Sequence, residues 1–347
     1  MRRVTGTAVV AAAGCVVAAI VLANVPTAGH SAPPVTEKTK HGHLAAGPTP
    51  VAMAPYYVAI NRYGGGAVHA TATGSKIATL RPPRGLKFDG AAGSENARTF
   101  VLAAQSASAS RFYQLQLNSR GKPGRLSLRA VPSLPRRFGS CPTALAGLAV
   151  SQDGRLLAIS LLSNCPTGNA GPGEILTVRL ATGRLLATFR PGHGYPQSLS
   201  WTLSDGLAYG WAGPRAGVWL ISDATKPGAS RRMVIGNSAG IDGLSGADNP
   251  LITPDGSAVT ATVGSGTKLA VADFSVRTGK ARGLLIRPVR SPAQYCGPLW
   301  TDTTGRNQLA ACGDGAEYEI QNGHPTKLAS PWQLPTYLVP GGPLIAW

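Results

Sequence analysis

The stretch "GLAVSQDGRLLAIS", residues 147–160, has two short apolar runs on either side of an Asp153-Gly154 pair. Apolar runs of this length around Asp-Gly are typical of a β-hairpin, because Gly supplies the positive φ of a tight turn and Asp accepts local hydrogen bonds. Asp153 taken alone could also be a metal ligand or a catalytic carboxylate. The rest of the chain decides between these interpretations.

The same pattern recurs three more times further along the chain. The copies are "SLSWTLSDGLAYGW" from residue 198, "NPLITPDGSAVTATV" from 249 and "PLWTDTTGRNQLAAC" from 298. The turn glycines are separated by 52, 50 and 49 residues: Gly154, Gly206, Gly256 and Gly305. Weaker copies are "AAGSENARTFVLAA" from residue 91 and "YLVPGGPLIAW" at the C-terminus. Because an aspartate stands in or beside the turn of each strong copy, we interpret Asp153 as a turn residue.

A second pair of strands follows several of these hairpins, with a Thr-Gly turn between its members. Examples are "AVHATATGSKIATL" (67–80), "EILTVRLATGRLLATF" (174–189) and "KLAVADFSVRTGKARGLLI" (268–286). Four short strands repeated about every 50 residues are typical of a β-propeller blade. Six hairpin copies predict an all-β propeller of six four-stranded blades over residues 55–347, with seven blades as the alternative.

The two ends of this region complement each other. The N-terminal part has the later strands of a blade without its start, and "TYLVPGGPLIAW" at the C-terminus has a start without an end. One blade shared by both ends would close the ring and remove its exposed sheet edges. The segments "YYVAIN" and "PLIAW" compete for one strand position, so the sequence leaves the division between the ends open.

The Asp-Gly hairpins, the 50-residue period and "YYVAIN…ATATGSKIATLRPP" together resemble the WD-repeat-like propellers that occur as membrane-anchored or secreted proteins of high-GC Gram-positive bacteria. The resemblance covers residues 56–347 and implies a fold and an extracytoplasmic location, but no activity. The full Gly-His…Trp-Asp pattern is absent from this sequence, and Gly192-His193, Asp223 and Asp273 match it only in part.

The composition fits turn-rich β-structure and a basic surface. Hydrophobic residues make up 43% and charged residues only 14% of the 347 residues, and the formal net charge is +18. This excess attracts polyanions such as anionic lipid or wall polymer. The basic residues are scattered, with short clusters at Arg136-Arg137 and Arg231-Arg232. Because no Lys/Arg-rich run is present, the sequence argues against a nucleic-acid partner.

The N-terminus predicts export. Arg2 and Arg3 precede about 22 residues without a charge, long enough to span a bilayer. We expect residues 1–26 to be a signal-anchor, with the rest of the chain outside the cell membrane, or a signal peptide, in which case the protein is secreted. Lipidation at Cys15 is an alternative, although the apolar run continues past it. Residues 27–54 are rich in Pro, Thr and Gly and predict a flexible tether.

Four cysteines lie beyond the predicted anchor, an even number that suggests disulfides in an exported domain. Cys141 and Cys165 are symmetric about Asp153, and Cys296 and Cys312 are symmetric about Thr304. Positions symmetric about a hairpin turn lie opposite each other, so we predict the pairs Cys141–Cys165 and Cys296–Cys312. A zinc site is the rival interpretation, but the clustered cysteines it needs are absent.

These bridges would lie at the end of each hairpin opposite the Asp-Gly turn. They would join the loop that leads into a blade to the loop between its second and third strands. By analogy with other propellers, these loops share the face that most often binds. The informative side chains of these loops are mostly basic or aromatic: Arg136, Arg137, His193, Tyr195, Trp211, Arg215, Asp242, Lys268, Arg287, Arg290, Tyr295 and Asp314. Ordinary solvated loops remain the alternative interpretation.

Two functions follow from these observations. The favoured one is an envelope-tethered, non-catalytic propeller that binds a protein partner or anionic envelope material through its loop face. The alternative is an extracytoplasmic hydrolase of the lactonase or cyclotransferase type, with Asp242, Asp248 and Asp314 as the best-placed carboxylates. The sequence contains no catalytic motif and predicts no cofactor or metal site.

Overall fold

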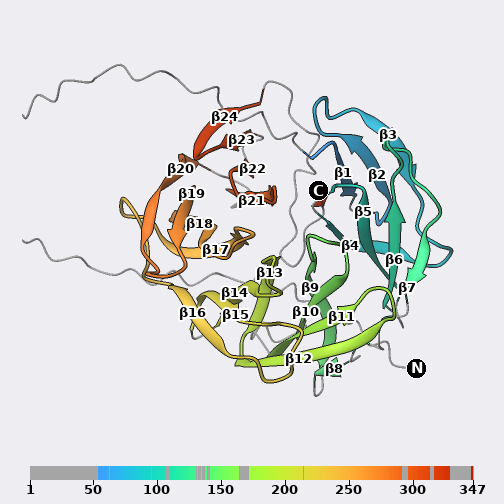
Figure 1. Ribbon diagram of the computed structural model, residues 1–347, viewed down its shortest axis with the longest axis horizontal. Coiled ribbons are helices and arrows are strands. Elements are labelled where there is room, and N and C mark those ends of the chain that lie inside the picture. The colour runs from blue at the N-terminus through green and yellow to red at the C-terminus, as the bar shows by residue number, and fades with distance from the viewer. Residues whose placement is uncertain are drawn as a thin grey trace, which may run out of the picture. The chain divides into compact units, whose positions relative to one another are not determined.

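The computed structural model describes residues 54–346 with gaps at 62, 95, 107–109, 130, 132–133, 135–136, 139–140, 164–171, 214, 291–295, 313–315 and 329–344. These residues form six antiparallel sheets arranged in a ring around a central axis (Figure 1). The described part of the chain contains strands and turns and no helix. The predicted six-bladed propeller is therefore confirmed, and the seven-bladed alternative is wrong.

We name the blades A to F in chain order and give their strands from the centre of the ring outward. Blade A consists of β25 (Ile345–Ala346), β1 (Tyr56–Ile60), β2 (Gly66–Ala70) and β3 (Lys76–Leu80). Blade B consists of β4 (Lys87–Gly93), β5 (Thr99–Gln105), β6 (Ser110–Gln116) and β7 (Ser127–Arg129). Blade C consists of β9 (Cys141–Val150), β10 (Leu156–Ser163), β11 (Pro172–Arg179) and β12 (Arg184–His193), and the short β8 (Arg137–Phe138) pairs with β9.

The remaining three blades each have four strands. Blade D consists of β13 (Tyr195–Trp201), β14 (Leu207–Ala212), β15 (Gly217–Ile221) and β16 (Arg231–Gly236). Blade E consists of β17 (Ser245–Ile252), β18 (Ala258–Ser265), β19 (Lys268–Ser275) and β20 (Ala281–Arg290). Blade F consists of β21 (Cys296–Thr301), β22 (Asn307–Cys312), β23 (Glu317–Gln321) and β24 (His324–Lys327).

The ring closes through blade A, as the sequence predicts. The C-terminal strand β25 pairs with β1 through Val58↔Ala346 and Ala59↔Ile345. Both C-terminal residues of this pair are buried. The two segments that competed for one position therefore occupy neighbouring positions: "PLIAW" provides the innermost strand and "YYVAIN" the second.

The Asp-Gly stretches form the tight turns between the first and second strands of their blades. In blade E the Thr253 hydroxyl donates to Asp255 Oδ1 at 2.6 Å, and the Ser257 amide donates to the same oxygen at 3.0 Å. These hydrogen bonds hold the pKa of Asp255 below its usual range. Gly256 and Gly154 have φ values of 73° and 72°, which side chains disfavour. The aspartates are turn residues, as predicted.

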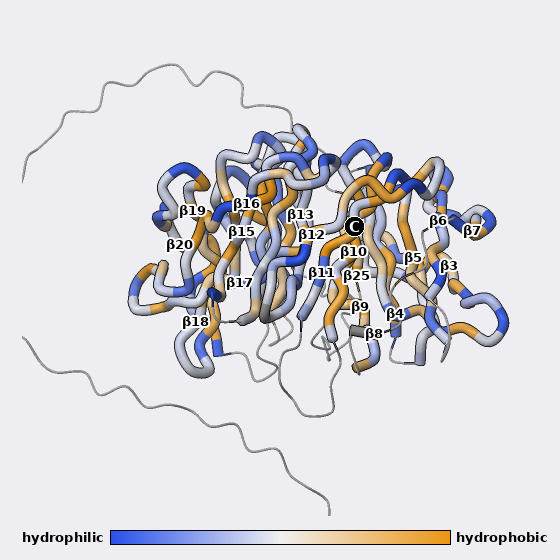
Figure 2. Tube along the Cα trace, turned by 90° about the horizontal axis from the view of Figure 1, so that it is seen from below, coloured by the Kyte–Doolittle hydropathy of each residue, from blue (hydrophilic) through white to orange (hydrophobic). Residues whose placement is uncertain are grey.

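Apolar side chains from facing blades form the core between the sheets. Between blades D and E, for example, Val218 and Ile235 pack with Val259 and Phe274, all fully buried. Figure 2 shows the apolar strands running between hydrophilic ends. Hydrogen bonds also join neighbouring blades, and the Trp201 indole N–H of blade D donates to the carbonyl of Ala149 in blade C at 3.0 Å. Each blade is stabilised by burying the faces of its sheet against its neighbours.

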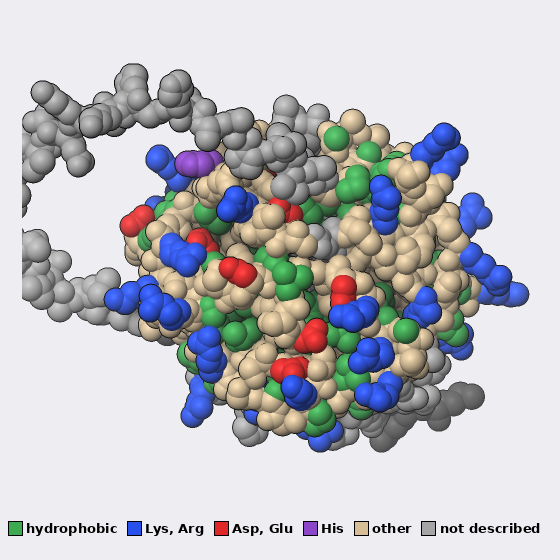
Figure 3. Space-filling model, in the orientation of Figure 1, with side chains coloured by type: hydrophobic (Ala, Val, Ile, Leu, Met, Phe, Trp, Pro, Cys, Tyr) green, Lys and Arg blue, Asp and Glu red, His purple; other side chains and the backbone are tan. Residues whose placement is uncertain are grey.

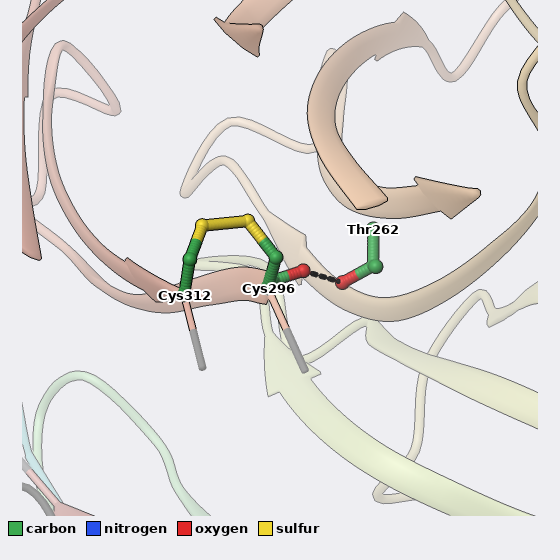
Figure 4. Close-up of a disulfide and its surroundings, with 3 residues drawn as sticks. All are labelled: Thr262, Cys296 and Cys312. Carbon is green, nitrogen blue, oxygen red and sulfur yellow. Dashed lines mark hydrogen bonds between the residues drawn. A yellow bond between two sulfur atoms is a disulfide. The ribbon is translucent and has the colours of Figure 1, made fainter. Parts of the chain in front are cut away.

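One predicted disulfide lies in blade F. Cys296 and Cys312 are direct cross-strand partners on β21 and β22 and are bonded to each other (Figure 4). The Thr262 hydroxyl of blade E donates to the Cys296 carbonyl at 2.6 Å, so the bridge is also tied to the next blade. Cys141 is disulfide-bonded at the start of β9. Its predicted partner Cys165 lies outside the described residues, so that pairing stays a prediction.

The predicted N-terminal anchor at residues 1–26 lies outside the described residues, as does the tether at 27–54 apart from its last residue. Within the described residues, no helix has the length and apolar character needed to cross a bilayer. Anchor and tether therefore stay predictions.

Candidate functional site

The strand order defines two faces of the ring. We call the "turn face" the side with the turns between first and second strands, such as residues 253–257, and between third and fourth strands, such as 276–280. We call the "loop face" the side with the loops between second and third strands and between successive blades. The Cys296–Cys312 bridge lies at the loop-face end of its hairpin, away from the turn at 302–306, as predicted.

The structure describes the side chains of seven of the twelve predicted binding residues. Arg136, Tyr295 and Asp314 lie outside the described residues. Arg137 lies on β8 and His193 at the end of β12, and the structure describes only the backbone of each. The other seven are Tyr195, Trp211, Arg215, Asp242, Lys268, Arg287 and Arg290.

Three of the predicted cations come together in blade E. Lys268 begins β19 and Arg290 ends β20, and the two are direct cross-strand partners. Arg287 lies three residues before Arg290 on the same outer strand, and all three side chains are exposed. None of them forms an ion pair with a described carboxylate. This part of the loop face therefore presents uncompensated positive charge.

Trp211 is not a surface residue, contrary to the prediction. It lies on β14 rather than in a loop, is 6% exposed, and packs edge-on against Tyr209 at a centroid distance of 6.5 Å. A Cβ on Gly194 would approach the Trp211 ring to 2.8 Å, so the chain leading into blade D passes directly over the indole. The strand extends further than the sequence suggests, and the aromatic side chain belongs to the core.

Arg215, Asp242 and Tyr195 do lie at the loop face. Arg215 is exposed, and its carbonyl accepts a hydrogen bond from the Trp219 indole N–H at 3.2 Å. Asp242 is exposed in a tight turn in which Ile241 and Leu244 exchange backbone hydrogen bonds of 3.0 and 2.9 Å. Tyr195 is half-buried at the start of β13. Among the described residues of the loop-face loops, Asp242 is the one carboxylate.

A second group of cations on the loop face is not among the predicted residues. Arg81 and Arg84 lie in the loop that leads from blade A into blade B, and Lys87 begins β4; all three are exposed. These cations could have been found in the sequence as the stretch "RPPRGLK", residues 81–87, whose prolines indicate a loop between two strands. Because these cations belong to blades A and B, positive charge on the loop face is not confined to blade E.

Polar side chains link the inner strands of blades D and E. The Gln197 side-chain amide donates to Asp248 Oδ1 at 2.6 Å, and the Ser198 hydroxyl donates to Asn249 Oδ1 at 2.7 Å. Ser198 and Asn249 have positive φ values of 46° and 48°, where a bulge interrupts each strand. Burial raises the pKa of Asp248, opposed by the hydrogen bonds that it accepts.

A second perturbed carboxylate lies on the inner strand of blade B. Burial raises the pKa of Asp89 from 3.8 to about 6. Its Oδ1 is buried and has no hydrogen-bond partner among the described residues. The bulge between Phe88 and Gly90 accounts for its position, because the residue is unpaired in the β4–β5 ladder.

Charge is unevenly distributed between the centre of the ring and its outer edge. Four aspartates lie in turns that follow inner strands: Asp153, Asp205, Asp255 and Asp302. The outer strands carry cations such as Arg231, Arg282 and Lys327. On the face drawn in Figure 3, most carboxylates lie nearer the centre and most basic side chains nearer the periphery. Among the described residues, no three His, Cys, Asp or Glu side chains cluster closely enough to hold a metal ion.

Comparison with known proteins identifies the fold alone. No protein family matches the sequence, and no curated protein matches it. The structure is similar to TolB from Acinetobacter baumannii, with a TM-score of 0.52 and 15% identity over 84% of this chain, which spans 65% of that protein. A chain of the nidogen/laminin complex gives a TM-score of 0.51 and 11% identity, covering 84% of this chain and 97% of that one.

A third neighbour is less similar in structure. The β-propeller domain of Cps50 (Swd1) from Myceliophteria thermophila gives a TM-score of 0.47 and 12% identity, covering 74% of this chain and 77% of that one. All these identities are low. The two neighbours with TM-scores above 0.5 show a likeness of fold, and the comparisons assign no activity to the chain.

Proposed function

We propose that this protein is an extracytoplasmic, envelope-tethered binding scaffold without catalytic activity, and that its partner binds at the loop face. The partner is an envelope protein or an anionic wall polymer. Residues 1–26 would hold the protein at the cell membrane, or direct its secretion if they are cleaved.

The observation that carries this proposal is the charge of the loop face. Lys268, Arg287 and Arg290 of blade E are exposed without an ion-pair partner among the described residues, and Arg81 and Arg84 add exposed charge between blades A and B. Uncompensated cations on one surface raise the local concentration of anionic partners. The chain of the nidogen/laminin complex shares this fold, which supports a protein partner as the alternative to a polymer.

The test is capture of wall polymer, or of proteins from solubilised envelopes, by the full-length protein. The variant Arg287→Glu/Arg290→Glu should weaken capture by several-fold at low salt, and the loss should diminish as salt rises. The matched control is Arg98→Glu/Arg306→Glu, which makes the same charge change at exposed positions on the turn face. Equal capture by both variants would argue against the loop face as the binding surface.

A hydrolase is the second candidate, and the raised pKa values of Asp89 and Asp248 are the observations that favour it. Carboxylates with raised pKa values are frequent at catalytic sites. The hydrogen bonds that Asp248 accepts from Gln197 and Asn249 also fit a purely structural link between blades D and E. An esterase or lactonase activity that Asp89→Asn or Asp248→Asn abolishes, with the fold intact, would replace the scaffold proposal.

A further inference from the structure

Six exposed cations lie on the outer strand of blade E, in the turn before it and beside its end. Arg277 and Lys280 lie in the turn before β20, Arg282, Arg287 and Arg290 lie on it, and Lys268 lies opposite its end. All six side chains are exposed. We call this series the blade E track: Lys268, Arg277, Lys280, Arg282, Arg287 and Arg290.

The charge of the track is nearly uncompensated. Arg282 lies 3.5 Å from the Asp273 carboxylate, and the other five cations form no ion pair with a described carboxylate. Elsewhere the outer cations are partly neutralised: Arg190 in blade C pairs with Glu174 at 3.1 Å, and Lys226 in blade D pairs with Asp223 at 2.8 Å. Exposed cations without an ion pair also occur in the neighbouring blades, such as Arg231 and Lys327, but among the described residues blade E has more of them than either neighbour.

Protection of an open sheet edge explains only part of this pattern. Charged side chains on an outer strand prevent edge-to-edge pairing with another molecule. Arg277 and Lys268 are not on β20, so edge protection does not require them. Blade D extends the charge, since the Arg232 guanidinium donates to the Val276 carbonyl in the turn beside Arg277 at 3.3 Å.

The shape of the track indicates the kind of partner. The ten residues of β20 span about 30 Å at roughly 3.3 Å per residue, so the cations form a line rather than a pocket. A small anion would contact only one or two of them, whereas a linear polymer with repeated anionic groups could contact most. Arg and Lys side chains bind phosphate oxygens strongly, and multiple contacts gain from counterion release.

A membrane surface fits the track less well than a polymer. Peripheral binding to a bilayer combines cations with large apolar side chains that enter the interface. None of the large exposed hydrophobic side chains in the described residues lies on β20. The track is thus suited to electrostatic contact with a hydrated chain.

We propose that the outer edge of blade E binds a linear phosphate-bearing polymer that lies along β20. The proposal rests on the proposed function, because Lys268, Arg287 and Arg290 also belong to the loop face. It goes beyond the proposed function because the binding surface then extends from the loop face along β20 to Arg277 and Lys280 at the turn face.

Long-chain inorganic polyphosphate is the probe, and binding by the full-length protein is measured against salt concentration. The variant Arg277→Gln/Lys280→Gln, at the turn-face end, should weaken binding about tenfold at low salt and reduce the log–log salt slope by about two. Arg287→Gln/Arg290→Gln should have a similar effect. Arg98→Gln/Arg306→Gln, which removes two exposed cations outside the track, should leave the slope nearly unchanged.

The outcomes separate this inference from the proposed function. If only Arg287→Gln/Arg290→Gln weakens binding, the loop face binds and the track is wrong. If neither variant differs from the control, the track is wrong, and the envelope-capture experiment then decides separately whether the proposed function is wrong. Equally tight binding of tripolyphosphate would indicate a local anion site and overturn the track. Equally tight capture by anionic phospholipid vesicles would show that a membrane is the partner. Circular dichroism of each variant verifies that the fold is retained.

Discussion

Blade A and blade E are built from the same four-stranded plan in very different ways. The strands of blade E contain 8, 8, 8 and 10 residues and come from one continuous segment of chain. Those of blade A contain 2, 5, 5 and 5 residues, and the innermost comes from the opposite end of the sequence. Blade A closes the ring, whereas blade E offers a ten-residue outer strand, a length that only β12 of blade C equals among the described outer strands.

Blade A and blade E therefore contribute differently to the protein: blade A closes the ring, and blade E provides the proposed binding edge. Blade E has long ladders and buried faces on both sides, so it can carry like charges along its edge without losing its structure. In the part of the chain that the structure describes, the inner edge of blade A is paired through Val58↔Ala346 and Ala59↔Ile345. We therefore expect changes in blade A and at its borders to affect stability most, and changes on the edge of blade E to affect binding.

Removal of residues 345–347 should have the largest effect, because blade A then loses its inner strand. Loss of the buried Ile345 side chain and of the β1 pairing should lower the free energy of unfolding by about 4 kcal/mol. Denaturant unfolding measures this, and hydrogen exchange should show protection lost first in blade A. Ile345→Val, the matched control, should cost only about 1 kcal/mol. Unchanged stability on deletion would remove the distinction between blades A and E.

Loss of the blade F disulfide should cause the second-largest decrease in the free energy of unfolding. Replacing both Cys296 and Cys312 by alanine opens a crosslink with a sequence separation of 16, worth about 3 kcal/mol. The midpoint of chemical unfolding should fall accordingly. Adding reductant to this variant should lower stability again, since Cys141 is also disulfide-bonded. Peptide mapping that links Cys141 to a cysteine other than Cys165 would contradict the predicted pairing.

Asp89 should make stability depend on pH. Its pKa in the folded protein is raised to about 6, so the folded state binds more protons than the unfolded state between pH 4 and 6. Stability should therefore fall as pH rises through this window, and Asp89→Asn should raise it on the order of 2 kcal/mol at pH 7.5 and much less at pH 4. Thermal unfolding against pH measures the difference. A profile for Asp89→Asn that matches that of the unsubstituted protein would refute the assignment.

The smallest of these effects should come from one hydrogen bond between blades E and F. The Thr260 hydroxyl donates to Gln308 Oε1 at 2.9 Å in a buried setting. Thr260→Val should cost about 1 kcal/mol by leaving that oxygen without the donor. Thr278→Val, at an exposed position of the same blade, should be nearly neutral. If urea denaturation gives the same loss of stability for Thr260→Val and Thr278→Val, the hydrogen bond between blades E and F makes no measurable contribution to stability.

Features set by local turn chemistry and by repetition were predictable from the sequence. Gly154 and its copies gave the blade period, and the spacing about Thr304 gave the Cys296–Cys312 pair, because a hairpin turn determines which positions face each other. The shared blade was predictable for the same reason. The competition between "YYVAIN" and "PLIAW" could not be resolved, since two adjacent strands of one sheet have the same apolar pattern.

Features that depend on strand ends and register were not predictable. Trp211 was assigned to a loop because Gly-Pro follows it, yet β14 continues through Ala212 and buries the indole. Asp89 was not predicted as a buried carboxylate. Its burial, which raises its pKa, depends on a bulge that only the pairing of β4 with β5 reveals. The exposure of the blade E track, and the lack of a described counter-ion for five of its six cations, are likewise three-dimensional properties.

The pairing of β25 with β1 has a consequence for the order in which the molecule is made. Residues 56–60 are synthesised before all the other described strands, but their inner partner β25 follows the strands of blades B to F in the sequence. Blades B to F can form as their strands become available, whereas the ring stays open until β25 has been synthesised. A pairing of such long range is slow to form. A chain without β25 would therefore have five complete blades, a three-stranded blade A and an exposed edge on β1.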